Sequence, residues 1–275
     1  MFDTLQNRLS VAGYLVAESA IRIGTGRTGA LTGSELPVIR NVDDQPLIPG
    51  SSLKGVLRSH LEAVARGMAP HASDWRQIAC DPTTEDAVCL DVTQIRTLKE
   101  QYQGDDAGLA AAIQRELCLL CQTFGAPWRA SPIRVRDLPV VDEEWFGQFD
   151  VRDGVAIDRD KGTVAIGPYD YEVVPAGTRF QLQIEAENLA PWQRGLLWLG
   201  IRALERGEIA VGGFVSRGLG WVRLEDVEAN FAASKQDLLN VMTGTGRGES
   251  PSAEEIKSWV VAFREKLNGK GAQDA

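Results

Sequence analysis

The stretch LIPGSSLKGVLR, residues 47–58, describes a helix start with two cations just inside it. A proline and a glycine interrupt the segment before it. Ser51 or Ser52 can cap a helix by accepting a hydrogen bond from a free N–H group one turn later. Apolar residues then recur at helical spacing, at Leu53, Val56, Leu57, Leu61 and Val64. The pattern predicts a helix from about Leu53 to Arg66.

The cations of this helix point to a binding role. Lys54 and Arg58 are four residues apart and therefore share a helix face. Gly55 costs about 1 kcal/mol relative to alanine inside a helix, which suggests that something approaches the backbone closely. A helix start with free amides, serine hydroxyls, lysine and arginine is suited to bind phosphate. The alternative is an ordinary capped surface helix.

A second candidate segment is GGFVSRGLGW, residues 212–221. Four glycines and one arginine between two strand-like segments predict a flexible loop whose amides can face an anion. It is not a dinucleotide-binding fingerprint, because no helix follows. The alternative is a glycine-rich hairpin turn. The candidate anion-binding residues of this loop are Gly212, Gly213, Ser216, Arg217 and Gly218.

The order of the expected elements predicts an α+β fold. The expected strands cover residues 9–23, 133–141, 164–166, 180–186 and 221–224, and the expected core helices cover 53–66, 107–120 and a segment starting at Pro191. This order follows the β-α-β-β-α-β pattern of ferredoxin-like, RRM-like folds. Residues 67–105 are polar, acidic and irregular, and two further helices are expected at 235–242 and 253–267.

Composition restricts the possible functions. The chain has 275 residues, 44% of them hydrophobic, and a net charge of −9, which argues against nucleic-acid binding through overall charge. Residues 81–116 carry eight acids and three bases, whereas residues 191–223 carry five arginines and two glutamates. Phosphate contacts need only a few well-placed cations. No apolar run is long enough to cross a membrane and the start has no signal pattern, so a cytoplasmic location is expected.

The four cysteines suggest a metal site. Cys118 and Cys121 have ligand spacing, and Cys80 and Cys89 could complete a tetrahedral thiolate site for a structural Zn²⁺. Such a site would tether the insertion to the second helix. The alternative is that Cys118 and Cys121 are small buried helix residues. A redox pair is disfavoured because the two cysteines fall at the end of the predicted helix rather than at a helix start.

The IPGSSLKG motif with Arg58, together with the loop at 212–220, resembles the RAMP superfamily, namely the backbone subunits of type III CRISPR effector complexes. Further agreeing segments are PVI at 37–39, CLLCQTFG at 118–125, VAIDR at 155–159 and YEVVPAGT at 171–178. The resemblance covers roughly residues 8–228. It implies an antiviral subunit that stacks along a guide RNA and presents it to a target RNA. Its implied partners are other CRISPR subunits, including copies or paralogues of itself.

The resemblance also implies a domain layout. Residues 1–230 would form the core, with a helical and zinc-binding insertion at 66–130 and a thumb hairpin region at 131–178. Residues 231–275 would form a helical tail outside the family match. Asp158 and Arg159 would contact RNA from a hairpin that wedges between base-pair segments. Several related subunits carry a zinc knot, which agrees with the cysteine pattern.

Enzymatic activity remains open at this stage. The family's target-RNA cutting uses an aspartate before the Pro37-Val38-Ile39 segment with a divalent metal, Mg²⁺ or Mn²⁺, and Glu35 stands at that position. The longer glutamate moves the carboxylate by about one C–C bond, and a shift of about 1 Å can cost a hundredfold in rate. The sequence therefore predicts either an RNA-binding scaffold or a metal-dependent endoribonuclease. A guide-precursor nuclease using His60 is an alternative within the same superfamily.

Overall fold

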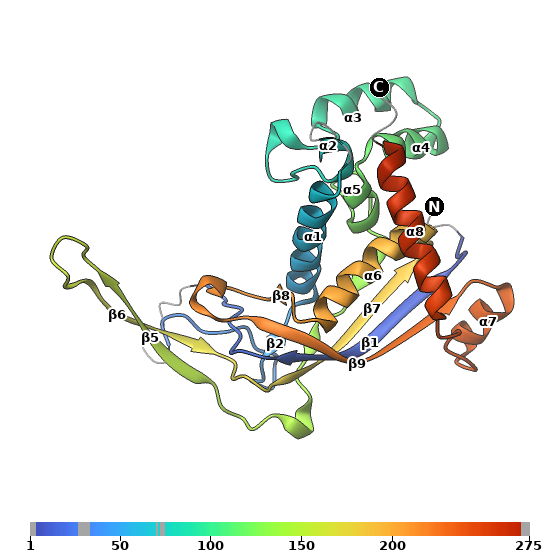
Figure 1. Cartoon of the computed structure of the whole chain (residues 1–275). Coiled ribbons are helices and arrows are strands. Elements are labelled where there is room, and N and C mark those ends of the chain that lie inside the picture. Colours follow the sequence, from blue (N-terminus) through green and yellow to red (C-terminus); the bar gives the residue numbers. More distant parts are fainter. Residues whose placement is uncertain (1–3, 27–33, 70, 72–74, 271–275) are drawn as a thin grey trace.

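The computed structural model describes residues 4–26, 34–69, 71 and 75–270, and it contains one five-stranded antiparallel sheet (Figure 1). The strand order is β3-β7-β1-β9-β8. The strands are β1 (Arg8–Ala17), β3 (Ile133–Val135), β7 (Arg179–Glu187), β8 (Ile209–Ala210) and β9 (Trp221–Ala232). Strand β1 lies at the centre, where Val11 pairs with Ile184 of β7 and with Ala229 of β9. The expected first strand therefore ends at Ala17 rather than at Ile23.

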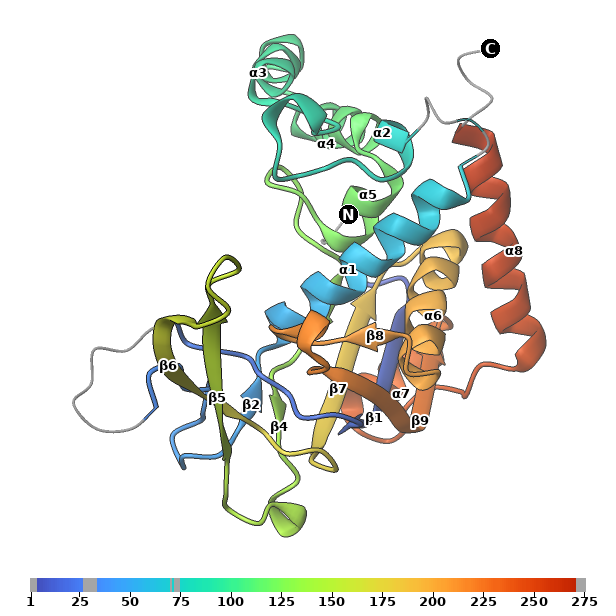
Figure 2. The ribbon, with the colours of Figure 1, turned by 60° about the vertical axis from the view of Figure 1, so that its left-hand side comes forward.

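Two helices cover one face of this sheet, α1 (Gly50–Gly67) and α6 (Pro191–Glu205) (Figures 1 and 2). Their buried leucines form the main core with the sheet. A side chain at Gly200 of α6 would come 3.2 Å from Leu57 and Leu61 of α1, so glycine allows the close approach of the two helices. The mixed α+β prediction is confirmed, and the order β1-α1-β3-β7-α6-β9 is compatible with a ferredoxin-like arrangement.

Helix α1 starts earlier than predicted, and the predicted serine cap is wrong. The residue before the helix is Pro49, and neither Ser51 nor Ser52 caps it. Instead, the main-chain N–H of Gly50 donates to Asp137 Oδ1 at 2.8 Å. A Cβ at Gly50 would lie 2.2 Å from the carbonyl oxygen of Val135, so this approach requires glycine.

The part of the insertion at 67–105 is more helical than its polar sequence indicated. The region expected to be irregular contains α2 (Trp75–Ile78) and α3 (Val92–Gln101), and α3 starts with an Asp91–Gln94 capping box. The single helix expected at 107–120 is two helices, α4 (Asp106–Glu116) and α5 (Leu119–Phe124). The break falls at Leu117 and Cys118. Both residues have an extended backbone, so α4 ends before α5 begins.

A two-stranded hairpin projects from the sheet (Figure 1), formed by β5 (Asp150–Ile157) and β6 (Val164–Val173). The predicted strand at 133–141 is divided into β3 and β4 (Leu138–Pro139), and β4 pairs with β2 (Leu47–Ile48). The short strand expected at 164–166 is the start of the longer β6. At Gly154, a side chain would lie 2.4 Å from the Tyr169 ring across the hairpin, so glycine makes room for that tyrosine.

The two helices predicted near the C-terminus are confirmed as α7 (Lys235–Thr243) and α8 (Ala253–Lys270). Helix α8 packs on α6 and buries Trp259, Phe263 and Leu267 to 3% exposure or less. The last part of the chain thus contributes to the main core, and residues 271–275 lie outside the described part. Among the described residues, no helix combines the length and apolar character needed to span a bilayer.

Candidate nucleic-acid interface and metal centre

Two glycines of the glycine-rich loop have backbone conformations and close contacts that only glycine allows. Gly212 and Gly220 have φ values of +93° and +86°, and a side chain at either would lie within 2.5 Å of a backbone oxygen. The N–H of Gly213 donates to the carbonyl of Arg22 at 2.7 Å, which ties the loop to the segment after β1. By contrast, Gly218 has open space around it, and the neighbouring Ser216 and Arg217 are exposed.

Phe214 organises the side chains of this loop. It has a left-handed backbone (φ 62°), and its ring contacts Tyr171 of β6 edge-on at 5.1 Å. The guanidinium groups of Arg22 and Arg217 lie 4.9 Å and 4.4 Å from the same ring. Arg217 Nη1 also donates to the Tyr169 hydroxyl at 2.6 Å, and this bond raises the pKa of Arg217. Two cations therefore share one ring at the base of the hairpin.

Arg22 is a buried cation without a counter-ion among the described residues. It is 8% exposed, its Nη2 donates a long hydrogen bond to the Leu36 carbonyl at 3.4 Å, and its Nε has no partner among the described residues. Burial lowers its pKa, and no carboxylate of the described chain pairs with it. A buried charge is costly unless it is paired, so this arrangement favours an added anion. Arg22 was not predicted from the sequence, where its only signal is a cation within the apolar run at 20–23.

Glu35 lies next to the same hairpin base. Its side chain is exposed, and its main-chain N–H donates to Asp170 Oδ1 of β6 at 2.6 Å. The adjacent Leu36 bridges to Tyr171, the residue that contacts Phe214. Within the described part of the chain, no further acidic, histidine or cysteine side chains converge with Glu35 as a set of three ligands. Any metal there would need ligands from the substrate or solvent.

Asp158, Arg159 and His60, which were also predicted to act on RNA, lie on segments other than the glycine-rich loop. Asp158 and Arg159 are at the hairpin tip, where Asp158 Oδ1 accepts the N–H groups of residues 160 and 161 and so shapes the turn. His60 is half-buried on α1. The pKa of Glu208 is lowered mainly by its hydrogen bond to Arg206, and to a smaller extent by His60.

The cations at the start of helix α1 are directed at the protein itself. Lys54 Nζ donates to the carbonyl of Ile133 at 2.9 Å, and burial, followed by the charge of Arg58, lowers the pKa of Lys54. Arg58 donates to Glu62, to the carbonyl of Gly125 and to Cys121. Gly55 is exposed, with open space around its Cα. Helix α1 also contacts β8, the strand that leads into the glycine-rich loop (Figure 2).

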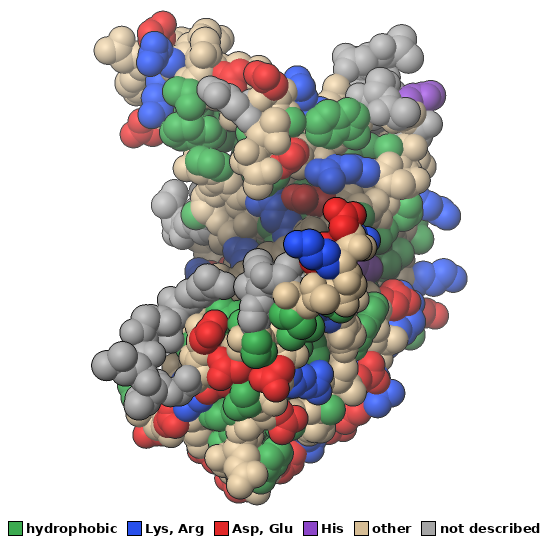
Figure 3. Space-filling view, turned by 90° about the vertical axis from the view of Figure 1, so that its left-hand side faces the viewer, with side chains coloured by type: hydrophobic (Ala, Val, Ile, Leu, Met, Phe, Trp, Pro, Cys, Tyr) green, Lys and Arg blue, Asp and Glu red, His purple; other side chains and the backbone are tan. Residues whose placement is uncertain are grey.

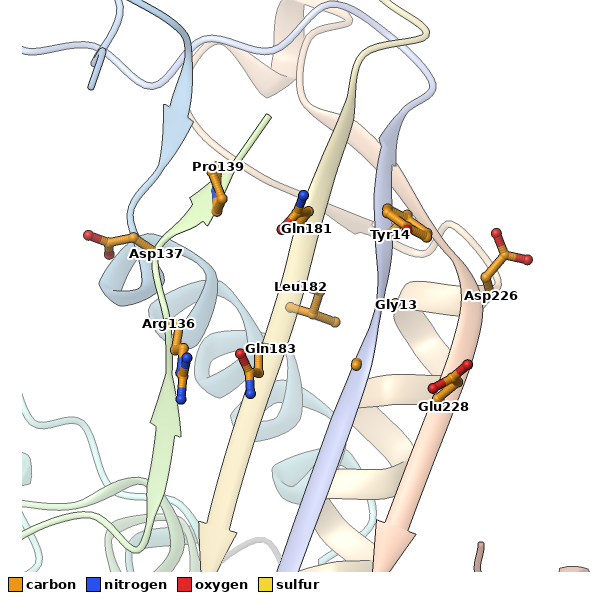
Figure 4. A pocket seen from close by; sticks show the side chains of 11 residues that line it. Gly13, Tyr14, Arg136, Asp137, Pro139, Gln181, Leu182, Gln183, Asp226 and Glu228 are labelled. Carbon is orange, nitrogen blue, oxygen red and sulfur yellow. The ribbon is translucent and has the colours of Figure 1, made fainter. Parts of the chain in front are cut away.

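The outer face of the sheet is an unfavourable surface for phosphate. A cavity of about 570 Å³ opens on the side away from α1 and α6 (Figure 4). Three carboxylates line it, from Asp137, Asp226 and Glu228, together with one cation from Arg136. Such an acidic lining repels a polyanion. The basic loop at the hairpin base is therefore the better candidate interface.

The four cysteines converge at one point of the insertion. Their Sγ atoms all lie within 4.8 Å of one another, and those of Cys80 and Cys121 are 3.5 Å apart. A Zn–S distance of about 2.3 Å gives S···S distances of about 3.8 Å in a tetrahedron, so the thiols fit a zinc ion. Hydrogen bonds from the other cysteines hold the pKa of Cys118 well below its usual range. These residues can hold a metal.

The Cys118–Cys121 pair lies at a helix start, and the prediction that it falls at a helix end is wrong. Cys118 is the N-cap of α5, where its Sγ accepts the N–H of Cys121 at 3.4 Å. The Cys-x-x-Cys pair therefore stands at a helix start, where thiolates are stabilised, and not at a helix end. The position of the pair no longer argues against redox chemistry. The convergence of all four thiols is what favours a metal site.

The chain belongs to the RAMP superfamily, whose sequence model matches residues 14–223. The resemblance inferred from the IPGSSLKG motif and the glycine-rich loop is thereby confirmed. Among individual proteins, the chain is similar to the CRISPR system Cms endoribonuclease Csm3 of Methanocaldococcus jannaschii. The two are 28% identical over 238 residues, which cover 82% of each chain.

Proposed function

We propose that this protein is a cytoplasmic backbone subunit of a type III CRISPR effector complex that holds the guide RNA for pairing with a target RNA. Membership of the RAMP superfamily and the similarity to a CRISPR system Csm3 protein support this proposal. The single observation that carries it is the pair of guanidinium groups, Arg22 and Arg217, on the ring of Phe214, where Arg22 has no carboxylate partner among the residues that the structure describes.

The chemistry of this cluster suits a phosphodiester. Arginine presents a planar fork of donors that matches phosphate oxygens, and an anion between Arg22 and Arg217 would offset both charges. The exposed Gly218 leaves room for a nucleic-acid backbone to approach the loop amides. Figure 3 shows several Lys and Arg side chains, with acidic side chains among them, in the hollow between the insertion and the hairpin region. A local basic surface of this kind compensates for the net charge of −9.

Two further segments complete the proposed guide path. Ser51 and Ser52 would contact phosphates at the start of α1, Lys54 would join them by turning its ammonium group away from the Ile133 carbonyl, and the open space beside Gly55 would admit the backbone of the guide. The hairpin, with Asp158 and Arg159 at its tip, would separate base-pair segments. Exposed β-branched side chains on the hairpin offer a surface for nucleobases, at Val151, Val155, Ile157 and Val164.

We also propose that the cysteine tetrad holds a structural Zn²⁺. The four thiolates leave no open coordination position, which is typical of a structural site. Cys118 and Cys121 would fix α5 to the segment that carries Cys80 and Cys89. The ion would cross-link these two segments and so add to the stability that the small apolar core of the insertion provides.

The RNA-binding proposal is tested with labelled single-stranded RNA, using the purified chain and its assembled complex. Arg22→Gln and Arg217→Gln should weaken binding equally for different sequences and reduce the salt slope by about 0.7 per lost contact. Arg202→Gln is the matched control, because Arg202 pairs with Glu205 on the solvent side of α6. If the unaltered protein, alone or assembled, does not bind RNA at low salt, the proposal is wrong.

Target-RNA cleavage is the second candidate function. It is favoured by the exposed carboxylate of Glu35 beside the hairpin base and by the endoribonuclease name of the similar protein. Glu35 would hold Mg²⁺ or Mn²⁺ against the scissile phosphate. Cleavage by the assembled complex should require the metal and should be lost in Glu35→Ala but kept in Glu143→Ala, an exposed acid elsewhere. Equal cleavage by both variants, or no cleavage by the unaltered complex, would contradict a catalytic role of Glu35 and leave RNA binding as the proposed function.

A further inference from the structure

Helix α1 carries a row of charged residues, two of which contact the segments that bear the cysteine tetrad. Lys54, Arg58, Glu62 and Arg66 are spaced by four residues and lie on one face. Arg66 donates to the carbonyl oxygens of Ala79 and Cys80 at 2.8 Å and 2.9 Å. Arg58 reaches the other half of the tetrad, at Cys121. The helix thus holds both cysteine-bearing segments of the insertion.

Arg58 is the member of this row that contacts a thiol directly. Its Nη2 lies 3.2 Å from Cys121 Sγ, its Nη1 donates to the Gly125 carbonyl at 3.0 Å, and its Nε donates to Glu62 at 2.8 Å. The Arg58 side chain is 19% exposed and that of Glu62 is 12% exposed. The guanidinium fork is therefore oriented by protein groups on three sides and directed at sulfur.

The charge of the tetrad explains why a cation belongs there. Four thiolates around one Zn²⁺ carry a net charge of −2, and three of the four cysteines are buried. Buried charge is tolerated when it is paired and hydrogen-bonded. We propose that Arg58, oriented by Glu62 and supported by Arg66, is a positioning residue that neutralises the metal-bound tetrad and thereby retains the metal, rather than a phosphate ligand.

This inference rests on the proposed zinc site, and it links that site to the helix that carries the IPGSSLKG motif. Outer-shell hydrogen bonds orient metal ligands, and their loss typically costs 10–100-fold in metal affinity. Release of the ion would remove the negatively charged zinc–thiolate group beside Arg58 and leave Glu62 as its acidic partner. Metal binding and the stability of helix α1 are then coupled through the Arg58 side chain.

The experiment compares unaltered protein with Arg58→Gln, Arg58→Lys and the control Arg202→Gln. Zinc content, the rate of zinc release to excess chelator and RNA binding are measured on the same preparations, kept saturated with zinc for the RNA assay. We expect about 10–100-fold faster release from Arg58→Gln, a smaller increase for Arg58→Lys, and no change for the control. RNA affinity should stay unchanged in all zinc-loaded variants.

Different results separate the possible failures. Zinc release at the unaltered rate from Arg58→Gln, with weakened RNA binding, would overturn the inference and make Arg58 a phosphate contact. Zinc-free unaltered protein that still binds RNA would remove the zinc site and the inference but leave the RNA proposal intact. If Arg58→Gln does not fold, Co²⁺-loaded Arg58→Lys and Glu62→Gln are compared with the unaltered protein. Shifted thiolate-to-cobalt absorption bands support the inference, and identical bands contradict it.

Discussion

The carboxylate of Asp137 accepts a hydrogen bond from the main-chain N–H of Gly50 at 2.8 Å and so closes the start of helix α1 from a distant segment. Replacing Asp137 with alanine should lower the free energy of unfolding by about 1 kcal/mol, as for the loss of a helix cap. Urea denaturation measures this change. Asp43→Ala, at an exposed turn, should have little effect, and equal losses in both variants would contradict the capping role.

Gly55 and Gly67 offer a matched pair on α1, because both have open space around the Cα. Alanine at either should stabilise the free protein, by up to about 1 kcal/mol, since glycine is a poor helix former. If RNA approaches the backbone at Gly55, Gly55→Ala should also weaken RNA binding, whereas Gly67→Ala should not. Thermal melting and RNA titration test both parts. Unaltered RNA affinity in Gly55→Ala would mean that the open space is not used.

Arg22→Met should separate stability from function. The methionine removes a buried charge that has no counter-ion in the described chain, so the free energy of unfolding should rise on the order of 1 kcal/mol. RNA affinity should fall, because a phosphate contact is lost. Denaturation and binding are measured on the same sample. A less stable protein with normal RNA affinity would show that Arg22 has a purely structural role.

Cys118→Ser should abolish metal binding and loosen the insertion. Cys118 both belongs to the tetrad and caps α5, so its loss affects the metal and the local helix start. Metal analysis should find less than one zinc per chain, and hydrogen exchange should increase in α2 to α5 but not in β1, β7 and β9. Treating the unaltered protein with a chelator should reproduce this pattern. Uniform exchange changes across the sheet would contradict a local role.

Phe263→Ala tests whether the last helix belongs to the core. Phe263 is 1% exposed, and deletion of a buried phenylalanine side chain typically costs about 3–5 kcal/mol. Denaturant unfolding should show this loss as a single shifted transition. Lys266→Ala, on the exposed side of α8, is the control. A change below about 1 kcal/mol in Phe263→Ala would mean that α8 is dispensable for stability.

Local periodicity was enough to predict the elements whose own sequence carries a clear hydrophobic pattern. Helices α6, α7 and α8 and strand β7 follow from helical spacing or strict alternation. The cap of α1 could not be predicted in this way, because Asp137 is 87 residues from Gly50. The break before α5 was also missed, since it depends on Cys118 taking an extended backbone beside Cys80, 38 residues away.

The candidate site was predicted in its residue types but not in its arrangement. Ligand spacing indicated the cysteine tetrad, and the four thiols do converge. Arg22 was missed because its surroundings come from Leu36 and from Phe214, a residue far along the chain. For Arg58, helical spacing indicated a shared face with Lys54 but gave no sign of the contact with Cys121. These roles depend on contacts between residues far apart in the chain, which cannot be inferred from the spacing of residues in one sequence.

The central position of β1 has a consequence for biosynthesis. Arg8 pairs with Glu187 on one side and with Ala232 on the other, so β1 leaves the ribosome long before either neighbour exists. Until residue 232 emerges, the nascent polypeptide has an unsatisfied strand edge that invites pairing with other chains. Prematurely terminated products should therefore aggregate, and translation past this point is the step that we expect chaperones to protect.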